Sequence, residues 1–261
     1  MAKRFNLNAD MAEGYGLWKM GDDEGLLSLI GTANIACGFH GGDYNIMGQV
    51  MRMAADNQVS IGAHPGFYDL HGFGRRQMQL PLDEVERLIS YQVGAALGVA
   101  ASQGVSVTHV KPHGAINNMA CADVDLAAAI MRAIKAVDKN LIVLVPVLSE
   151  LVSEGQKAGL QVAAEVFADR AYMPDGQLAP RNRPDAMIHD AQHSLEHCLR
   201  MFEEGVIIDV EGGRLDVEAV SVCVHGDGPS ALQTAAHIKA GLTKAGFQMC
   251  SLPEMLALQN G

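Results

Sequence analysis

Strand-like runs alternate with helical stretches along the whole 261-residue chain, and no Pro-, Gly- or Ser-rich linker separates them. This alternation predicts one α/β domain over residues 1–261, and the handedness of β-α-β crossovers makes its sheet largely parallel. A small hairpin, Ile207–Glu211 with Leu215–Glu218, is expected before the last strand. The predicted strands are Phe5–Asp10, Thr32–Cys37, Val59–His64, Val107–His113, Leu141–Pro146, Gln161–Asp169 and Ala219–His225.

Every second residue is polar in several of these strands, and this period of two indicates the kind of sheet. The polar sets are Asn6, Asn8 and Asp10 in the first strand, His109, Lys111 and His113 in the fourth, Glu165 and Asp169 in the sixth, and Ser221, Cys223 and His225 in the last. Strands buried on both faces of an open parallel sheet would be apolar almost throughout. Because helices cover the apolar side, the polar sides must converge on a shared interior. We therefore predict a closed or nearly closed (β/α) barrel with its site at the carboxyl ends of the strands.

Composition excludes several classes of partner. A formal charge of −11 and a pI near 5.3 make nucleic acid and anionic membranes poor partners. No window approaches the ~20 apolar residues of a membrane span, and no long apolar segment precedes the first strand, so we expect a cytoplasmic protein. The five cysteines are scattered without CxxC spacing, which argues against a disulfide framework or a thiolate zinc site.

Three of the predicted strand ends carry candidate metal ligands or bases. Asp10 and Glu13 could bind a metal, orient a histidine or act as a base, or could be an N-cap and a solvated carboxylate. His40 lies in a glycine-rich turn that either binds a ligand or is an ordinary strand-to-helix turn. His64 is held before a proline, which restricts its backbone. Imidazole and carboxylate ligands suit zinc or manganese, so Asp10, His40 and His64 are a candidate set for a divalent metal, although their spacing is not diagnostic.

Lys111 is the most informative single residue because the predicted pattern points it into the barrel, with His113 facing the same way. A buried lysine is costly unless it is paired or functional. Asp10 or Glu165 could supply the counter-charge. A purely structural ion pair is the alternative.

Further charged groups follow other strands. Arg75 and Arg76 suit a carboxylate or phosphate, which guanidinium binds through two hydrogen bonds, or are an exposed solubilising pair. Asp169 opens a long irregular loop that contains Arg181 and has the length of a lid or a partner surface. His225 begins a glycine-rich turn before a helix, an arrangement typical of an anion site, although the neighbouring Asp227 weakens this interpretation. The chain has neither a P-loop nor a GxSxG motif.

Six blocks, in order and nearly end to end, resemble the LamB/YcsF family: LNADMAEGYG, NIACGFHGGD, GAHPGFYDLHGFGRR, HVKPHGAINN, EVFADRAY and CVHGDGPSA. The resemblance implies an irregular, TIM-like seven-stranded (β/α) barrel related to the polysaccharide-deacetylase group. It also implies ATP-dependent opening of 5-oxo-L-proline to L-glutamate, with ATP as co-substrate. In that enzyme this chain would be the A subunit of a 5-oxoprolinase, acting with B and C subunits.

Opening a lactam requires a cation for the substrate carboxylate, a base for water and donors for the developing oxyanion. Arg75 or Arg76 suits the first role, Asp10 or Glu165 the second, and Lys111, His113 or His40 the third. We expect the substrate site to include also His64, Asp169, Arg181 and His225. Two other functions remain open, a stand-alone metal-dependent amide or acetyl hydrolase and a non-catalytic subunit that presents the substrate to a partner.

Overall fold

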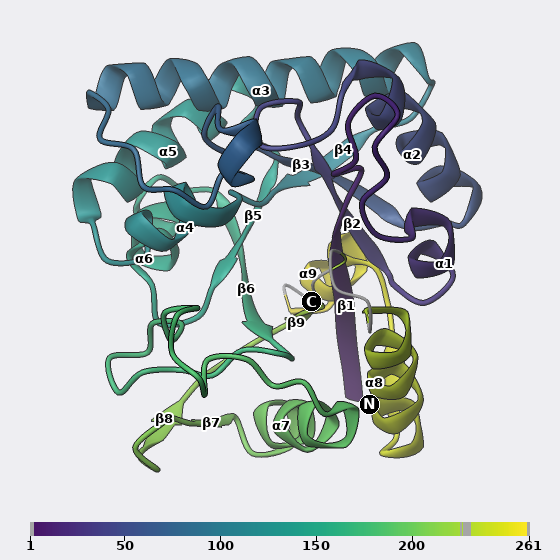
Figure 1. The fold of residues 1–261 in the computed structure, drawn as a ribbon, viewed down its shortest axis with the longest axis vertical. Helices are drawn as coiled ribbons and strands as arrows, with labels where there is room; N and C mark the ends of the chain where they lie inside the picture. The colour runs from purple at the N-terminus through teal and green to yellow at the C-terminus, as the bar shows by residue number, and fades with distance from the viewer. Residues whose placement is uncertain (1–2, 225, 227–230, 260–261) are drawn as a thin grey trace.

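Seven parallel strands close into a barrel at the centre of the molecule (Figure 1). The structure is a computed structural model that describes residues 3–224, 226 and 231–259. Neighbouring strands follow the order β1-β2-β3-β4-β5-β6-β9, and β9 pairs again with β1 to close the ring. The predicted seven-stranded (β/α) barrel is therefore confirmed. Its strands are β1 (Lys3–Met11), β2 (Thr32–Ala36), β3 (Ser60–His64), β4 (Val107–Val110), β5 (Ile142–Pro146), β6 (Gln161–Phe167) and β9 (Ser221–Val224).

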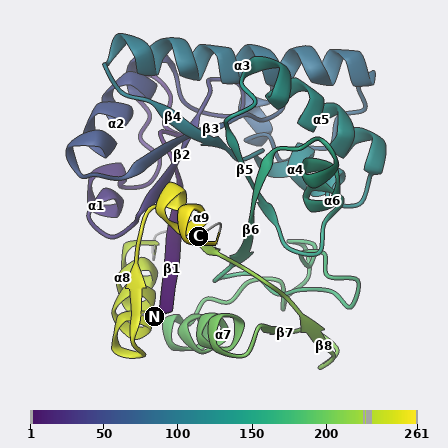
Figure 2. The same ribbon diagram turned by 180° about the vertical axis from the view of Figure 1, so that it is seen from behind.

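Helices surround the barrel on the outside, as both ribbon views show (Figures 1 and 2). Their starts follow local chemistry: the Asp43 side chain accepts hydrogen bonds from two backbone N–H groups of α2, and the Asp123 side chain accepts one from the backbone of α5. Among the described residues no helix has both the length and the apolar character needed to span a bilayer. The surrounding helices are α1 (Asp23–Leu27), α2 (Tyr44–Asp56), α3 (Leu82–Ser102), α4 (Gly114–Ala120), α5 (Val124–Val137), α6 (Glu150–Lys157), α7 (Ala191–Glu203) and α8 (Ala231–Lys244).

The interior of the barrel is polar, as the period of two predicts. Asn6 Nδ2 donates to Thr32 Oγ1 (2.8 Å), and Ser221 Oγ donates to Asn6 Oδ1 (2.6 Å). Asn8 continues this chain of hydrogen bonds, because its Nδ2 donates to Ser221 Oγ (2.7 Å). All four side chains are fully buried. Such a network is stable only when its members are paired, and the pairing holds the neighbouring strands in register.

The amino end of the barrel is covered by two elements that the sequence did not lead us to expect. Strand β10 (Phe247–Met249) pairs in parallel with the start of β1, and helix α9 (Leu252–Gln259) follows it. In Figure 2 this helix lies in front of the barrel. Leu252 packs in an apolar cluster with Ile142 and Leu144 of β5. The carboxyl ends of the strands are left as the face on which a site can form.

The predicted hairpin is confirmed with shorter strands, because β7 (Val206–Ile208) and β8 (Arg214–Asp216) pair antiparallel between α7 and β9. Three predicted barrel strands also end early, β2 at Ala36, β4 at Val110 and β6 at Phe167. The residues that follow them therefore belong to loops at the carboxyl end. His225 lies outside the described residues.

Candidate active site

A buried lysine lies between two carboxylates at the carboxyl end of the barrel. Lys111 Nζ is 3.0 Å from Asp10 Oδ1 and 3.2 Å from Glu165 Oε2, and it also donates to Asn8 Oδ1 (3.2 Å). Burial alone would lower the pKa of Lys111, but Asp10 and Glu165 hold this pKa well above its ordinary value. Lys111 is therefore a cation at neutral pH, and its ammonium lies within ion-pairing distance of two carboxyl groups.

Asparagines from neighbouring strands orient both carboxylates. Asn34 Nδ2 donates to Asp10 Oδ1 (2.9 Å), and Asn8 Nδ2 donates to Glu165 Oε2 (3.0 Å). Glu165 is fully buried, and its Oε1 has no hydrogen-bond partner within the described part of the chain. Burial raises the pKa of Glu165 above its usual value, while Lys111 acts in the opposite direction. Glu165 thus lies beneath the site, whereas Asp10 borders the pocket described below.

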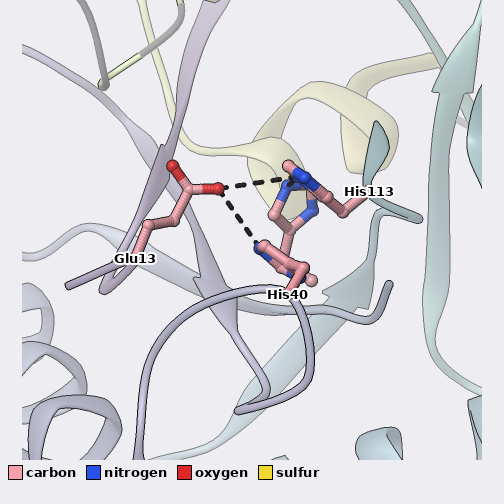
Figure 3. Close-up of side chains that lie close together, drawn as sticks. Glu13, His40 and His113 are labelled. Atoms are coloured by element: carbon pink, nitrogen blue, oxygen red, sulfur yellow. Dashed lines mark hydrogen bonds and ion pairs between the residues drawn. The ribbon is translucent and has the colours of Figure 1, made fainter. Parts of the chain in front are cut away.

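Three histidines and one glutamate form a second cluster beside Asp10. His40 comes from the loop after β2, His64 from the end of β3, and His113 from the residue before α4. Figure 3 shows the Glu13 carboxylate directed toward His40 and His113. Glu13 Oε1 lies 3.2 Å from His40 Nε2 and 3.6 Å from His113 Nδ1, and His64 Nε2 lies 3.0 Å from His113 Nδ1. One potential ligand atom from each residue lies within 4.8 Å of the other three.

Two of the rings in this cluster stack. The rings of His40 and His113 are 3.6 Å apart and almost parallel, at 6°. Burial lowers the pKa of both histidines well below the ordinary value, so both rings are neutral at pH 7. Gly74 makes room for them: its φ is +62°, and a Cβ at this position would lie 2.7 Å from His40 Cβ. The cluster therefore presents neutral imidazoles and one carboxylate, which are ligands suited to a divalent transition metal.

A cavity of about 300 Å³ opens above these groups and is lined by Asp10 together with three arginines, Arg75, Arg170 and Arg181. Arg170 is buried, its Nη2 donates to the Ala179 carbonyl (2.6 Å), and its Nε lacks a partner among the described residues. Burial, with Arg181 adding to it, lowers the pKa of Arg170 to about 10, so this guanidinium keeps its charge at pH 7. Three guanidinium groups at one cavity suit a carboxylate or phosphate.

The structure brings most of the predicted site residues together. Lys111, His64 and His113 line the cavity with Asp10, Arg75 and Arg181, while His40 lies in the adjacent histidine cluster and Glu165 beneath Lys111. Arg76 is an exception, because its guanidinium pairs with Asp69 and its side chain is 67% exposed. Asp169 does not line the cavity, although the next residue, Arg170, does.

Two features of the site differ from the sequence prediction. Arg170 was not among the predicted site residues, and the predicted metal ligands are not the same four residues that cluster in the structure. Glu13 and His113, rather than Asp10, group with His40 and His64 as potential metal ligands. The backbone explains this: Ala12 has a φ of 58°, so the chain turns at the end of β1 instead of continuing the period of two. Asp10 stays beside the cluster, with its Oδ2 3.4 Å from His64 Nε2. Arg170 could have been predicted only from its position in the sequence, directly after the candidate residue Asp169.

Comparison with known families gives a match over residues 5–257 to the LamB/YcsF family. The chain belongs to the LamB/YcsF family. This LamB/YcsF protein is 49% identical to the 5-oxoprolinase A subunit of Azoarcus sp. (strain BH72), and the alignment covers 97% of this chain and 98% of that relative. The predicted family is therefore confirmed.

Solved structures agree with this LamB/YcsF assignment. The lactam utilization protein from Thermus thermophilus is 40% identical and matches with a TM-score of 0.89, covering 95% of this chain and 99% of that one. A peptidoglycan N-acetylglucosamine deacetylase catalytic domain from Eubacterium rectale ATCC 33656 matches with a TM-score of 0.53 at 11% identity, covering 97% and 89%. At that identity the likeness concerns the fold alone. It agrees with the predicted TIM-like barrel.

Proposed function

We propose that this chain is the A subunit of a 5-oxoprolinase, which opens 5-oxo-L-proline to L-glutamate with ATP as co-substrate. The observation that carries the proposal is the cavity lined by both the Asp10 carboxylate and three arginines. A relative named as the A subunit of 5-oxoprolinase, 49% identical over nearly the whole chain, supports the choice of substrate. The free state of all five cysteines agrees with a reducing cytoplasm, where we place the reaction.

The substrate explains why cations and a base would share one cavity. 5-Oxoproline carries a carboxylate, which Arg75, Arg170 and Arg181 can hold through charge-assisted hydrogen bonds. Its lactam is an amide that water attacks slowly unless both partners are activated. Transfer of a phosphoryl group from ATP to the lactam oxygen would activate the carbon and release ADP. Water would then add to that carbon, the C–N bond would break as the nitrogen takes a proton, and a second water would release phosphate from the resulting acyl phosphate.

Of the two candidate bases, we assign Asp10 the role of taking the proton from water. Asp10 borders the cavity, and Lys111 and Asn34 hold its Oδ1, which orients the carboxylate. Glu165 is fully buried and reaches the site only through Lys111. Lys111 Nζ contacts Asn8, Asp10, Glu165 and the sulfur of Cys223, so we assign it a positioning role and not direct contact with the oxyanion.

An exposed apolar loop next to the site supports the assignment of partner subunits. Leu17 is 98% exposed and Trp18 is 75% exposed, and Trp18 lines the same surface hollow as Glu13 and His40. Large apolar side chains exposed together often mark a protein interface. We propose that the B and C subunits cover this loop and thereby complete the site.

The proposal is tested by mixing the purified chain with its B and C partners, 5-oxoproline and ATP, and measuring glutamate and ADP while each component is omitted in turn. We expect turnover only in the complete mixture. Asp10→Asn should lower kcat about 10²–10⁴-fold, because the variant cannot accept a proton from water.

Two other outcomes would overturn the proposed 5-oxoprolinase function. Glutamate formation by the chain alone, without ATP and abolished by a chelator, would favour a stand-alone metal-dependent hydrolase, an alternative that the histidine cluster keeps open. Wild-type turnover by Asp10→Asn and Lys111→Ala in the assembled complex would favour a subunit that only presents the substrate.

A further inference from the structure

Two backbone carbonyls fix the proton positions on two rings of the histidine cluster. His64 Nδ1 lies 2.6 Å from the carbonyl oxygen of Lys111, and His113 Nε2 lies 2.8 Å from that of Phe73. A carbonyl oxygen can only accept a hydrogen bond, so each of these ring nitrogens must carry the proton. In the neutral form of each ring, the other nitrogen then has a bare lone pair.

These two lone pairs point at each other across a short distance. His64 Nε2 and His113 Nδ1 are 3.0 Å apart, and both rings are buried. Two acceptors at this separation repel unless a positive charge lies between or beside them. A shared proton or a metal cation can supply that charge, and histidines that bind metals characteristically donate their second N–H to a backbone carbonyl, as both of these do.

The remaining members of the cluster favour the metal over the proton. Glu13 Oε1 lies 3.6 Å from His113 Nδ1 and 3.2 Å from His40 Nε2, and neither Glu13 nor His40 is more than 6% exposed. Neighbouring ligand atoms around a tetrahedral zinc ion, with bonds of ~2.0–2.1 Å, are about 3.4 Å apart. Separations of 3.0, 3.2 and 3.6 Å in this cluster are close to that spacing, and all four ligand atoms lie within 4.8 Å of one another. Because the His40 and His113 rings stack, one of the two rings must turn to direct its nitrogen at a shared ion. Figure 3 shows the Glu13 carboxylate directed at a ring nitrogen of His40 and at one of His113.

We propose that Glu13, His40, His64 and His113 bind one divalent transition-metal ion of the zinc class. Three imidazoles and one carboxylate disfavour Mg²⁺ and Ca²⁺, which prefer oxygen ligands. His64 and His113 also line the cavity of Asp10, so the ion would border the same space and could polarise a bound oxygen there. The proposal concerns binding and does not depend on which reaction the chain performs.

The test measures metal binding to tag-free protein in the absence of substrate and ATP. We expect close to one zinc per chain after dialysis against metal-free buffer, and competition with a chromophoric chelator should give the dissociation constant. Loss of an outer hydrogen-bond partner costs ~10–100-fold in metal affinity, so loss of a ligand in Glu13→Gln or His113→Gln should cost at least as much. Mg²⁺ should not compete.

Two control variants make the result specific. His197→Gln replaces a histidine that is also buried but does not belong to the cluster, and it should keep wild-type affinity. Asp10→Asn should also keep the metal while losing turnover, so failure of the proposed function and failure of the metal site can be told apart. Circular dichroism and the thermal midpoint of each variant show whether it is folded.

A second measurement needs no variant. Trp18 is the single tryptophan of the chain and lines the hollow that contains Glu13 and His40, so one equivalent of Co²⁺ should quench its fluorescence and show the visible bands of four-coordinate cobalt. The proposal would be overturned by a protein that binds no metal or gives neither cobalt signal. It would also be overturned if wild type, Glu13→Gln and His113→Gln bound zinc with equal affinity. A proton shared between His64 and His113 would then be the explanation for their short separation.

Discussion

Lys111 Nζ lies 3.0 Å from Asp10 Oδ1 in a barrel interior where the lysine is 3% exposed. A second carboxylate, Glu165, approaches the same ammonium to 3.2 Å. The lysine thus holds two acidic groups close together, and only one of them, Asp10, reaches the cavity. Removing one partner from such a buried set leaves the others charged and unpaired, which is far more costly than removing an exposed charge.

Lys111→Met should therefore lower the free energy of unfolding by about 3–5 kcal/mol, because Asp10 and Glu165 lose their buried counter-charge. Urea unfolding at pH 7 measures the change. Lys157→Met is the control, since that side chain is 66% exposed in its pair with Glu154 and should contribute little. Adding Glu165→Gln to Lys111→Met should restore part of the loss, and equal losses in the two single lysine variants would contradict this account.

The polar interior and the central ion pair could be predicted from sequence because both depend on periodicity. Alternation along a strand determines which residues face inward, and a buried lysine needs a partner on a neighbouring strand. The alternation placed Asp10 and Glu165 on the inward side, where either could supply the counter-charge, and both contact Lys111. The extent of a single domain over residues 1–261 stays a prediction.

Features that depend on loop conformation could not be predicted in this way. Glu13 joins the histidines because Ala12 adopts a left-handed backbone, and a non-glycine residue gives little sign of this in sequence. Arg75 and Arg76 are adjacent and chemically identical, yet one lines the cavity and the other pairs with Asp69. The conformation of the turn between β3 and α3 decides which of the two arginines faces the cavity, and no periodic pattern in the sequence indicates that conformation.

This arginine pair provides a test of substrate binding. If Arg75 holds the substrate carboxylate, Arg75→Ala should raise KM for 5-oxoproline about tenfold to a hundredfold, because a charge-assisted hydrogen bond contributes ~1.5–3 kcal/mol. Arg76→Ala should leave KM close to wild type, since Arg76 does not line the cavity. Steady-state kinetics of the assembled enzyme measure both. A similar rise in KM for the two variants would remove Arg75 from the proposed site.

Gly74 offers a test of how the histidine cluster is packed. Gly74→Ala places a Cβ 2.7 Å from His40 Cβ and 2.9 Å from His113 Cδ2, so both rings must move. Gly104→Ala is a matched control, because Gly104 has a similar φ of +67° and nothing within 4 Å of the added Cβ. We expect Gly104→Ala to cost about 1–2 kcal/mol for its left-handed backbone alone. Gly74→Ala should cost more in urea unfolding and should also weaken zinc binding, whereas matching effects would show that the rings adapt freely.

The last prediction concerns acid stability, and it rests on a histidine outside the site. Burial, helped by Arg200 and His193, lowers the pKa of His197 to about 4, against about 6.5 in an unfolded chain. Between pH 6.5 and 4, His197 is protonated in the unfolded protein but stays neutral in the folded protein. The free energy of unfolding therefore falls as pH decreases toward 4. The contribution of one such histidine is about 1.4 kcal/mol per pH unit across this window.

His197→Gln removes that contribution, so its free energy of unfolding should fall less steeply than that of the wild type between pH 6.5 and 5. Urea titrations at pH 7.0, 6.0 and 5.0 measure the slope. Some slope should remain, because burial also lowers the pKa of His109 to about 3. His237→Gln, which alters a half-buried histidine of α8 that bonds to Gln192, is the control and should keep the wild-type slope. An unchanged slope in His197→Gln would mean that this histidine is not held neutral in the folded protein.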